Sequence, residues 1–381
     1  MDHAENIPHI LMKKRQRTGA LQDAGANLRA LMNAQRLGVR WSSTALGWRR
    51  PAGGLFIAAI FFAAGIFNIV AAPTGPAWPP LPDVARVVFV RSITQPADVG
   101  IKGSALKRFA NWFVGSAGDD KRLVNPFGIA LDESGGFCVT DTGANRVCRF
   151  DAANQRWQQW DHIGNIHFAA PVAVAEKGGI IFVADSALGE VVAFDLTGKL
   201  QFEIKQGLTR PSGLAILGNQ LYVSDAGCHC VGVFDLQGNR VTNFGERGTG
   251  PGEFNFPTHI TADNQGHLLV TDSLNSRIQV LDASGKYLSE IGSAGDTSGH
   301  FGRPKGVAVD TFGHIYVADA VFDNLQIFDL SGRLLLSIGQ TGTGPGEFGL
   351  PNGIAIGADN RIYVTDPGNH RIQVFQYVGQ Q

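Results

Sequence analysis

The stretch Phe256–Ser284, FPTHITADNQGHLLVTDSLNSRIQVLDAS, contains three short apolar runs, each followed by residues that favour turns. Residues 263–266 (DNQG) separate the first run from the second, and residues 272–275 (DSLN) separate the second from the third. Residues 282–285 (DASG) follow the third run. Alternating β-branched runs cut by Asp, Asn and Gly clusters are typical of antiparallel strands joined by tight turns. The stretch therefore predicts a strand meander.

The same pattern recurs six times at a nearly constant interval. The prolines that open the units are Pro126, Pro171, Pro211, Pro257, Pro304 and Pro351, with spacings of 45, 40, 46, 47 and 47 residues. The aspartates that end the second apolar run of each unit are Asp141, Asp185, Asp225, Asp272, Asp319 and Asp366. Two landmarks with almost the same period indicate a true repeat. Since one unit of this size cannot bury both of its faces, neighbouring units must pack against each other.

Each unit has room for four strands. A third strand of the type Arg277–Leu281 follows the aspartate, then comes an Asp-x-x-Gly turn such as Asp235–Gly238, and a fourth strand such as Lys286–Gly292 ends the unit. Glycine accepts the positive φ that a short hairpin with a bulge requires. Four antiparallel strands at this period are typical of a propeller blade. The sequence thus predicts an all-β fold, a six-bladed β-propeller of four-stranded antiparallel blades.

The sixth unit lacks a fourth strand, because the chain ends at Gln381 soon after its third strand. Upstream, residues 108–119 match residues 285–296 and precede Pro126 much as that segment precedes Pro304. We therefore expect residues 106–115 to complete the last blade and close the ring, which leaves no free sheet edge at the seam. A further strand is expected at Arg86–Arg91, on the rim.

Four motifs in these units resemble the NHL-repeat family. They are P-x-G-I-A at the start of a blade, Y-V-x-D in its middle, N-x-R-I-Q-V-F after that, and G-x-G-x-G-E-F between blades. The last occurs at Gly248–Phe254 and again at Gly342–Phe348. The resemblance covers residues 106–381 and weakens in the first three blades, where Leu188–Glu190 and Cys228–Cys230 replace N-x-R. It implies a six-bladed propeller, a fold that hosts many functions.

The region before the repeats is basic and then apolar. Residues 1–50 carry nine Lys and Arg against three Asp and Glu, a net charge of +6. Gly53–Ala72 is a run of 20 residues in which Asn68 is the only strongly polar side chain. A helix of this length spans the hydrocarbon core of a membrane. By the positive-inside rule, we expect one N-terminal transmembrane helix with the basic end in the cytoplasm.

This reading divides the chain into four parts. They are a basic cytoplasmic segment (1–52), the transmembrane helix (53–72), a Pro-rich linker (73–84) that acts as a stiff spacer, and the propeller (85–381). The protein would be a single-pass inner-membrane protein with its propeller in the periplasm or outside the cell. The alternative is a cleaved signal sequence, with small residues near Ala72 at the cleavage site.

One face of a propeller collects the loops that open the blades, and the predicted ligand site lies there. The position two residues after each opening proline is Gly or Ala in five units and His259 in the fourth. A histidine where the others carry a small residue is either a core histidine or a ligand-facing one. With the residues that directly follow the prolines, it predicts a ligand site formed by Ser212, Thr258, His259, Lys305 and Asn352.

The cysteines and repeated charges have competing readings. Cys228-His229-Cys230 offers two thiolates and an imidazole, which suit Zn²⁺ or Cu⁺, and oxidation of the thiols competes with metal binding. No cofactor is predicted, with Zn²⁺ or Ca²⁺ as the alternative. Cys138 and Cys148, on adjacent strands, could form a disulfide or stay as buried thiols. Asp and Arg pairs such as Asp141 and Arg146 recur across blades, which favours a structural role over a catalytic one.

The leading functional hypothesis is a membrane-anchored, non-catalytic binding module for a protein, a peptide or an envelope polymer. The alternative is a propeller enzyme, of lactonase or lyase type, with a metal at the channel mouth. Residues 106–381 carry 20 Lys and Arg against 28 Asp and Glu, a net charge of −8, so no nucleic-acid partner is expected. The chain contains no G-x-S-x-G, H-E-x-x-H or Walker motif.

Overall fold

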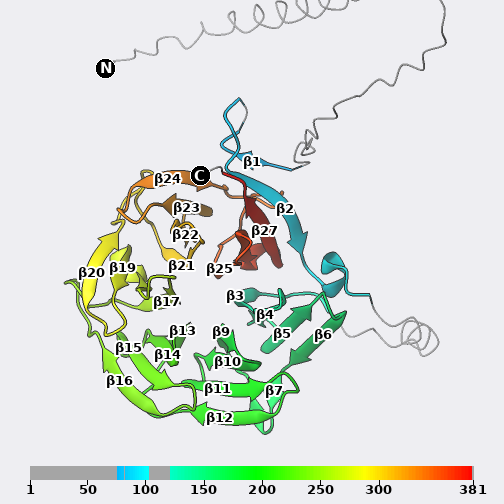
Figure 1. Cartoon of the computed structure of the whole chain (residues 1–381), viewed down its shortest axis with the longest axis vertical. Helices are drawn as coiled ribbons and strands as arrows, with labels where there is room; N and C mark the ends of the chain where they lie inside the picture. The colour runs from blue at the N-terminus through cyan, green and yellow to red at the C-terminus, as the bar shows by residue number, and fades with distance from the viewer. Residues whose placement is uncertain (1–74, 81, 103–120, 380–381) are drawn as a thin grey trace, which may run out of the picture. The chain divides into compact units, whose positions relative to one another are not determined.

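The computed structural model describes residues 75–80, 82–102 and 121–379, which form six antiparallel sheets arranged as blades around a central channel (Figure 1). Blade one consists of β3 (Pro126–Leu131), β4 (Phe137–Asp141), β5 (Arg146–Asp151) and β6 (Arg156–Trp160). Blade two consists of β9 (Pro171–Lys177), β10 (Ile180–Asp185), β11 (Glu190–Asp195) and β12 (Leu200–Ile204). Blade three consists of β13 (Pro211–Leu217), β14 (Gln220–Asp225), β15 (Cys230–Asp235) and β16 (Arg240–Phe244). Blade four consists of β17 (Pro257–Ala262), β18 (Leu268–Asp272), β19 (Arg277–Leu281) and β20 (Tyr287–Ile291). Blade five consists of β21 (Pro304–Val309), β22 (Ile315–Asp319), β23 (Asn324–Phe328) and β24 (Leu334–Ile338). Blade six consists of β25 (Ile354–Ile356), β26 (Arg361–Asp366), β27 (Arg371–Tyr377) and, from the start of the chain, β2 (Val87–Ile93). The fold prediction of six four-stranded blades is confirmed.

Short elements lie before, between and within the blades. They are β1 (Ala77–Trp78), the small hairpin of β7 (His162–Ile163) and β8 (Ile166–His167), and the 3₁₀ turns η1 (Pro96–Val99), η2 (Ser273–Asn275) and η3 (Pro367–Asn369). The apolar side chains of the strands form six buried clusters, one at each contact between neighbouring blades. Each sheet therefore buries both faces against its neighbours, which explains why its strands are apolar on both faces.

Blade six is closed by β2, which pairs antiparallel with β27 from Val87↔Tyr377 to Ile93↔Ile372 and lies beside it in Figure 1. The prediction that residues 106–115 close the ring is wrong, because β2 takes the outer place in the blade; residues 106–115 themselves lie outside the described residues. The strand expected near Arg86–Arg91 exists, but it belongs to the blade. Val87 and Ile93 are buried, so apolar burial as well as backbone pairing holds β2 in place.

Part of the predicted spacer also joins blade six. β1 pairs with β2 through Ala77↔Val88 and Trp78↔Val87, and the Trp78 ring lies edge-on to Phe375 at 5.8 Å between centroids. This part of the predicted Pro-rich spacer over 73–84 is therefore packed on the propeller, since Trp78 gains apolar contact there. The predicted cytoplasmic and transmembrane segments, residues 1–72, lie outside the described residues. Within the described ranges, no helix has the length and apolar character needed to span a bilayer.

The recurring Asp–Arg pairs are structural. Arg277 donates to the fully buried carboxylate of Asp272 at 2.9 Å, and Asp272 also accepts the backbone N–H of Asn255 at 2.6 Å. Guanidinium nitrogens of Arg277 also donate to the carbonyls of Gly250 and Glu253 in the loop between blades. The pair thus ties a turn within one blade to the loop that opens it. The predicted structural role is confirmed, and the same arrangement occurs at Asp141–Arg146 and Asp366–Arg371.

Candidate functional site

The inner strands approach one another closely around the channel, and small residues make this approach feasible. A Cβ atom on Gly128 would lie 2.5 Å from the Val172 carbonyl oxygen, and one on Gly306 would lie 2.2 Å from that of Asn352. At Gly213, it would lie 2.8 Å from the Cα of His259. Steric exclusion of a Cβ atom therefore explains why blades one, three and five carry Gly at the position where blade four carries His259.

A cavity of about 210 Å³ opens where the blade-opening loops converge. Its lining residues are Phe127, Val172, Ser186, Arg210, Ser212, Ala226, Phe256, Thr258, Arg303, Lys305 and Asn352. We call it the mouth cavity. Four of the five predicted ligand-site residues, Ser212, Thr258, Lys305 and Asn352, come together here from four different blades. Whether they bind a ligand stays a prediction.

Three cations, Arg210, Arg303 and Lys305, line the mouth cavity, and its lining contains no Asp or Glu. Within the described chain, none of the three forms an ion pair with a carboxylate. Burial, together with the nearby charge of Arg303, lowers the pKa of Lys305 to about 8. Lys305 is still mostly protonated at neutral pH, so the cavity holds positive charge that the protein itself does not neutralise.

An aromatic ring orients one of these cations. The guanidinium carbon of Arg210 lies 5.2 Å from the centroid of the Phe256 ring, a cation–π contact between the loops that open blades three and four. A guanidinium held over a ring can still donate its N–H groups to a planar acceptor such as a carboxylate.

The hydroxyl groups of Ser212 and Thr258 in the mouth cavity differ in whether they form hydrogen bonds within the protein. The Ser212 hydroxyl donates to the Pro257 carbonyl at 2.7 Å, so it mainly ties blade three to blade four. The Thr258 hydroxyl is buried and forms no hydrogen bond with any described group. A buried hydroxyl without a partner is costly, and because the Thr258 oxygen is shielded from solvent, a ligand in the cavity reaches it only if its neighbours shift.

His259 lies apart from the mouth cavity. It lines a cavity of about 330 Å³ whose lining residues are mostly apolar and include Glu176. Burial lowers the pKa of His259 to about 4, so the ring is neutral at neutral pH. The Val307 N–H donates to its Nδ1 at a long 3.5 Å. His259 therefore does not line the mouth cavity with the other four predicted residues, and whether it contacts a ligand stays a prediction.

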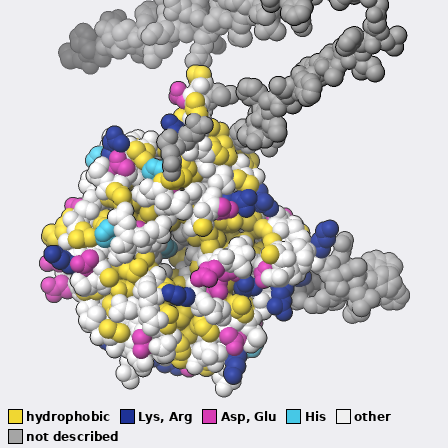
Figure 2. Space-filling view, viewed as in Figure 1, with side chains coloured by type: hydrophobic (Ala, Val, Ile, Leu, Met, Phe, Trp, Pro, Cys, Tyr) yellow, Lys and Arg dark blue, Asp and Glu magenta, His cyan; other side chains and the backbone are white. Residues whose placement is uncertain are grey.

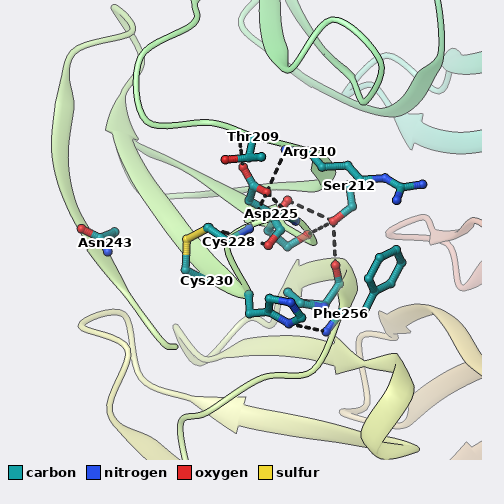
Figure 3. Close-up of a disulfide and its surroundings, with 12 residues drawn as sticks. Thr209, Arg210, Ser212, Asp225, Cys228, Cys230, Asn243 and Phe256 are labelled. Carbon is teal, nitrogen blue, oxygen red and sulfur yellow. Dashed lines mark hydrogen bonds between the residues drawn. A yellow bond between two sulfur atoms is a disulfide. The ribbon is translucent and has the colours of Figure 1, made fainter. Parts of the chain in front are cut away.

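Cys228 and Cys230 form a disulfide at the turn between β14 and β15 (Figure 3). The predicted Zn²⁺ or Cu⁺ site needs two thiolates, and in this form the two sulfur atoms are bonded to each other, so Cys228, His229 and Cys230 do not provide that ligand set. His229, the third predicted metal ligand, accepts the Phe256 backbone N–H on its Nδ1 at 3.1 Å. Oxidation, the competing reading of this motif, is the arrangement that the structure has.

Cys138 and Cys148 are free and buried. They are not paired across the sheet, because Val139 lies opposite Cys148 and Arg149 lies opposite Cys138. Neighbouring register positions point to opposite faces of a sheet, which places the two thiols in different blade contacts. Burial raises the pKa of Cys148 to about 12 and that of Cys138 further, so both stay protonated.

Arg210, Arg303 and Phe256 were missed as site residues from the sequence. All three directly precede a blade-opening proline, at a position that is Asn125, Ala170 and Leu350 in the other blades. Two arginines at one repeat position of an acidic domain are the signal that would have identified them.

In the described part of the chain, no three His, Cys, Asp or Glu side chains are arranged to hold a metal ion.

The family model of DUF5128, described as a 6-bladed beta-propeller, matches residues 206–291 and 308–380. A probable peptidyl-alpha-hydroxyglycine alpha-amidating lyase of Caenorhabditis elegans is 30% identical over 145 residues, which are 35% of this chain and 41% of that protein. The chain thus matches less than half the length of this relative.

Solved structures agree on the architecture. Virginiamycin B lyase from Staphylococcus aureus superposes with a TM-score of 0.51 at 15% identity, covering 68% of this chain and 96% of the lyase. A protein of unknown function from Bacteroides thetaiotaomicron superposes with a TM-score of 0.53 at 15% identity, covering 68% of this chain and 70% of that one. At these identities the likeness concerns the fold alone. Sequence repeats, sheet topology and these likenesses identify the chain as a six-bladed β-propeller.

Proposed function

We propose that this protein is a propeller of the NHL-repeat type that acts as a non-catalytic binding module and takes an anionic group at its mouth cavity. The observation that carries the proposal is the convergence of Arg210, Arg303 and Lys305 on a cavity without a lining carboxylate. An anion there would screen the repulsion between Lys305 and Arg303 and accept charge-assisted hydrogen bonds.

The size of the cavity suggests what enters it. About 210 Å³ is below the usual range of roughly 300–1,000 Å³ for pockets that enclose whole small molecules. One acidic side chain, a chain terminus or a single acidic group of a polymer fits such a volume. The proposed partner is therefore a protein, a peptide or an envelope polymer that inserts one anionic group.

The charge around the cavity favours local recognition. The propeller carries a net negative charge over residues 106–381, and acidic and basic side chains are interspersed over the face shown in Figure 2. A partner with one well-placed anion is attracted to the three cations, whereas a uniformly anionic polymer is repelled by much of the remaining surface. The apolar segment Gly53–Ala72 and the basic residues before it support membrane anchoring with the propeller outside the cytoplasm.

Binding of a short glutamate-rich peptide tests this function. We expect the double variant Arg303→Gln, Lys305→Gln to bind the peptide at least about tenfold more weakly than the native protein, since two charge-assisted contacts are lost. The matched control is Lys199→Gln, Lys286→Gln, which removes two exposed lysines from outer hairpins and should bind like the native protein. Equal binding by all three proteins would refute the proposed site.

A lyase activity is the second candidate, and the likeness to the Caenorhabditis elegans lyase supports it. Its test is incubation of the native protein with a peptidyl-alpha-hydroxyglycine, with and without a chelator. Turnover that stops on chelation would favour the enzyme over the binding module.

A further inference from the structure

We propose that Cys228 and Cys230 form a redox-active pair that exchanges electrons with a dithiol and thereby loosens one side of the mouth cavity. The proposal goes beyond anion binding and does not depend on it. It starts from a comparison of the same turn in different blades.

The disulfide replaces a polar clamp. In blade four the side chains of Asn275 and Arg277 both donate to Asp272, at 2.8 and 2.9 Å, and in blade six Asn369 and Arg371 do the same to Asp366. Counted from the aspartate, Cys228 and Cys230 occupy the Asn and Arg positions in blade three. Asp225 therefore lacks the arginine partner of those blades, and a covalent bond joins the two positions instead.

The fold does not need this bond to form the turn. The residue between the two cysteines, His229, has φ of 58°, and the residues at the same place in blades four and six, Ser276 and His370, have φ of 53° and 55° without a disulfide. A bond that closes a loop of three residues also restricts the unfolded chain very little. Stability alone therefore gives a weak reason for a disulfide at this position.

The turn that contains the disulfide is hydrogen-bonded to both loops that form one side of the mouth cavity. Asp225 accepts the backbone N–H groups of Cys228, at 3.2 Å, and of Arg210, at 2.9 Å (Figure 3). On the other side, His229 accepts the N–H of Phe256, the residue whose ring faces Arg210. The turn that carries the disulfide is thus hydrogen-bonded to both residues that make the cation–π contact, through Asp225 to Arg210 and through His229 to Phe256.

The chemistry is a thiol–disulfide exchange with a dithiol as the co-reactant. Cys228 is partly exposed and Cys230 is buried, so a thiolate of the dithiol attacks the Sγ of Cys228. The S–S bond breaks, the Sγ of Cys230 leaves as a thiolate and takes a proton, and a mixed disulfide forms. The second thiol of the dithiol then displaces Cys228. The dithiol is oxidised to a disulfide, and the pair is reduced by two electrons and two protons.

Reduction leaves the turn with neither the clamp nor the bond. His229 is then held at a positive φ, which is strained for a residue other than glycine, by the hydrogen bonds of Asp225 to the turn and by the bond that its own ring accepts from Phe256. When the turn relaxes, the bond from Phe256 to His229 weakens, and Phe256 moves relative to Arg210. Reduction of the cysteine pair in this way changes the arrangement of Phe256 and Arg210 in the mouth cavity.

Dithiothreitol is the probe for the test, applied to the full chain under native conditions, followed by maleimide labelling and intact mass. We expect two labelled thiols after reduction, while the buried Cys138 and Cys148 stay unlabelled until the protein is denatured. Failure of excess dithiothreitol to expose two thiols in the folded protein would overturn the proposal.

Amide hydrogen exchange provides the second readout. Exchange in peptides covering 205–212 and 254–260 should rise at least threefold on reduction, and peptides of blade five should not change. The variant Cys228→Ser, Cys230→Ser should show the faster exchange permanently and should not respond to dithiothreitol. Unchanged exchange in the reduced protein would show that the pair does not affect the mouth. Neither measurement uses a mouth ligand, so a failure of anion binding leaves this test intact.

Discussion

Blades three and four have the same turn after their second strand but stabilise it with different chemistry. Blade four uses a buried carboxylate, an asparagine and an arginine, which also hold the loop before its opening proline. Blade three uses a disulfide, and the loop before Pro211 is shorter and lacks the G-x-G-x-G-E-F motif that supplies carbonyls to the arginine. The difference shows that the repeat conserves the backbone turn, while its side chains adapt to the neighbouring loop.

The largest effect is expected where the clamp of blade four is broken. Arg277→Met leaves the fully buried Asp272 without its cation, and we expect the free energy of unfolding to fall by about 3–5 kcal/mol. Urea denaturation followed by circular dichroism measures this. The matched control is Arg333→Met, which removes an exposed arginine paired with Asp329 and should cost less than about 1 kcal/mol. Equal losses in the two variants would contradict a structural role for the clamp.

His259 of blade four, which lies against Gly213 of blade three, predicts that the free energy of unfolding depends on pH. His259 has a folded pKa of about 4, below the ordinary value of 6.5, so the unfolded chain binds more protons between these values. Its contribution to stability is present above pH 6.5 and is lost as the pH falls towards 4, by up to about 3 kcal/mol.

His259→Gly removes this titration and places in blade four the residue that Gly213 provides in blade three. The difference in unfolding free energy between the native protein and the variant should therefore shift by that amount between pH 7.5 and pH 4. A difference that does not depend on pH would mean that the imidazole is hydrated in the folded protein.

The disulfide of blade three should contribute less than the clamp of blade four. Because the closed loop has only three residues, Cys228→Ser, Cys230→Ser should lower the free energy of unfolding by about 1–2 kcal/mol. Denaturation of the native protein with and without dithiothreitol checks the same quantity independently. A loss as large as that of Arg277→Met would show that the two devices are equivalent and would remove the contrast between the blades.

The smallest effect is expected at the mouth, and it has the opposite sign. The lowered pKa of Lys305 means that its positive charge destabilises the folded state below pH 8, so Lys305→Met should stabilise the protein at pH 7 by about 1 kcal/mol after allowance for its partial exposure. The gain in stability should disappear as the pH rises from 8 to 10.5, because Lys305 of the native protein then loses its proton, and its charge no longer destabilises the folded state. Thermal melts at pH 7 and pH 10 compare the two proteins. A destabilised variant at pH 7 would mean that the lysine stem packs more than its charge repels.

Periodicity alone determined much of this protein. The spacing of the prolines and aspartates predicted six blades, their four strands and the structural Asp–Arg pairs, because each blade repeats the same local rules of turn and strand formation. The residues after the prolines also predicted most of the mouth cavity, since equivalent positions in a closed ring face a common axis. That His259 lines a different cavity did not follow from the sequence, because sequence position fixes neither the depth of a side chain along the channel nor its rotamer.

Three outcomes needed the tertiary structure. The choice of Val87–Ile93 to close blade six depends on pairing with β27, and backbone hydrogen bonds between strands carry little sequence information, so two strand-like segments could not be distinguished in advance. The separation of Cys138 from Cys148 depends on a register that one residue of slippage would reverse. The meeting of Arg210 with Phe256 depends on how neighbouring loops fold together. Local repeats specify each blade, whereas contacts between blades decide which residues meet.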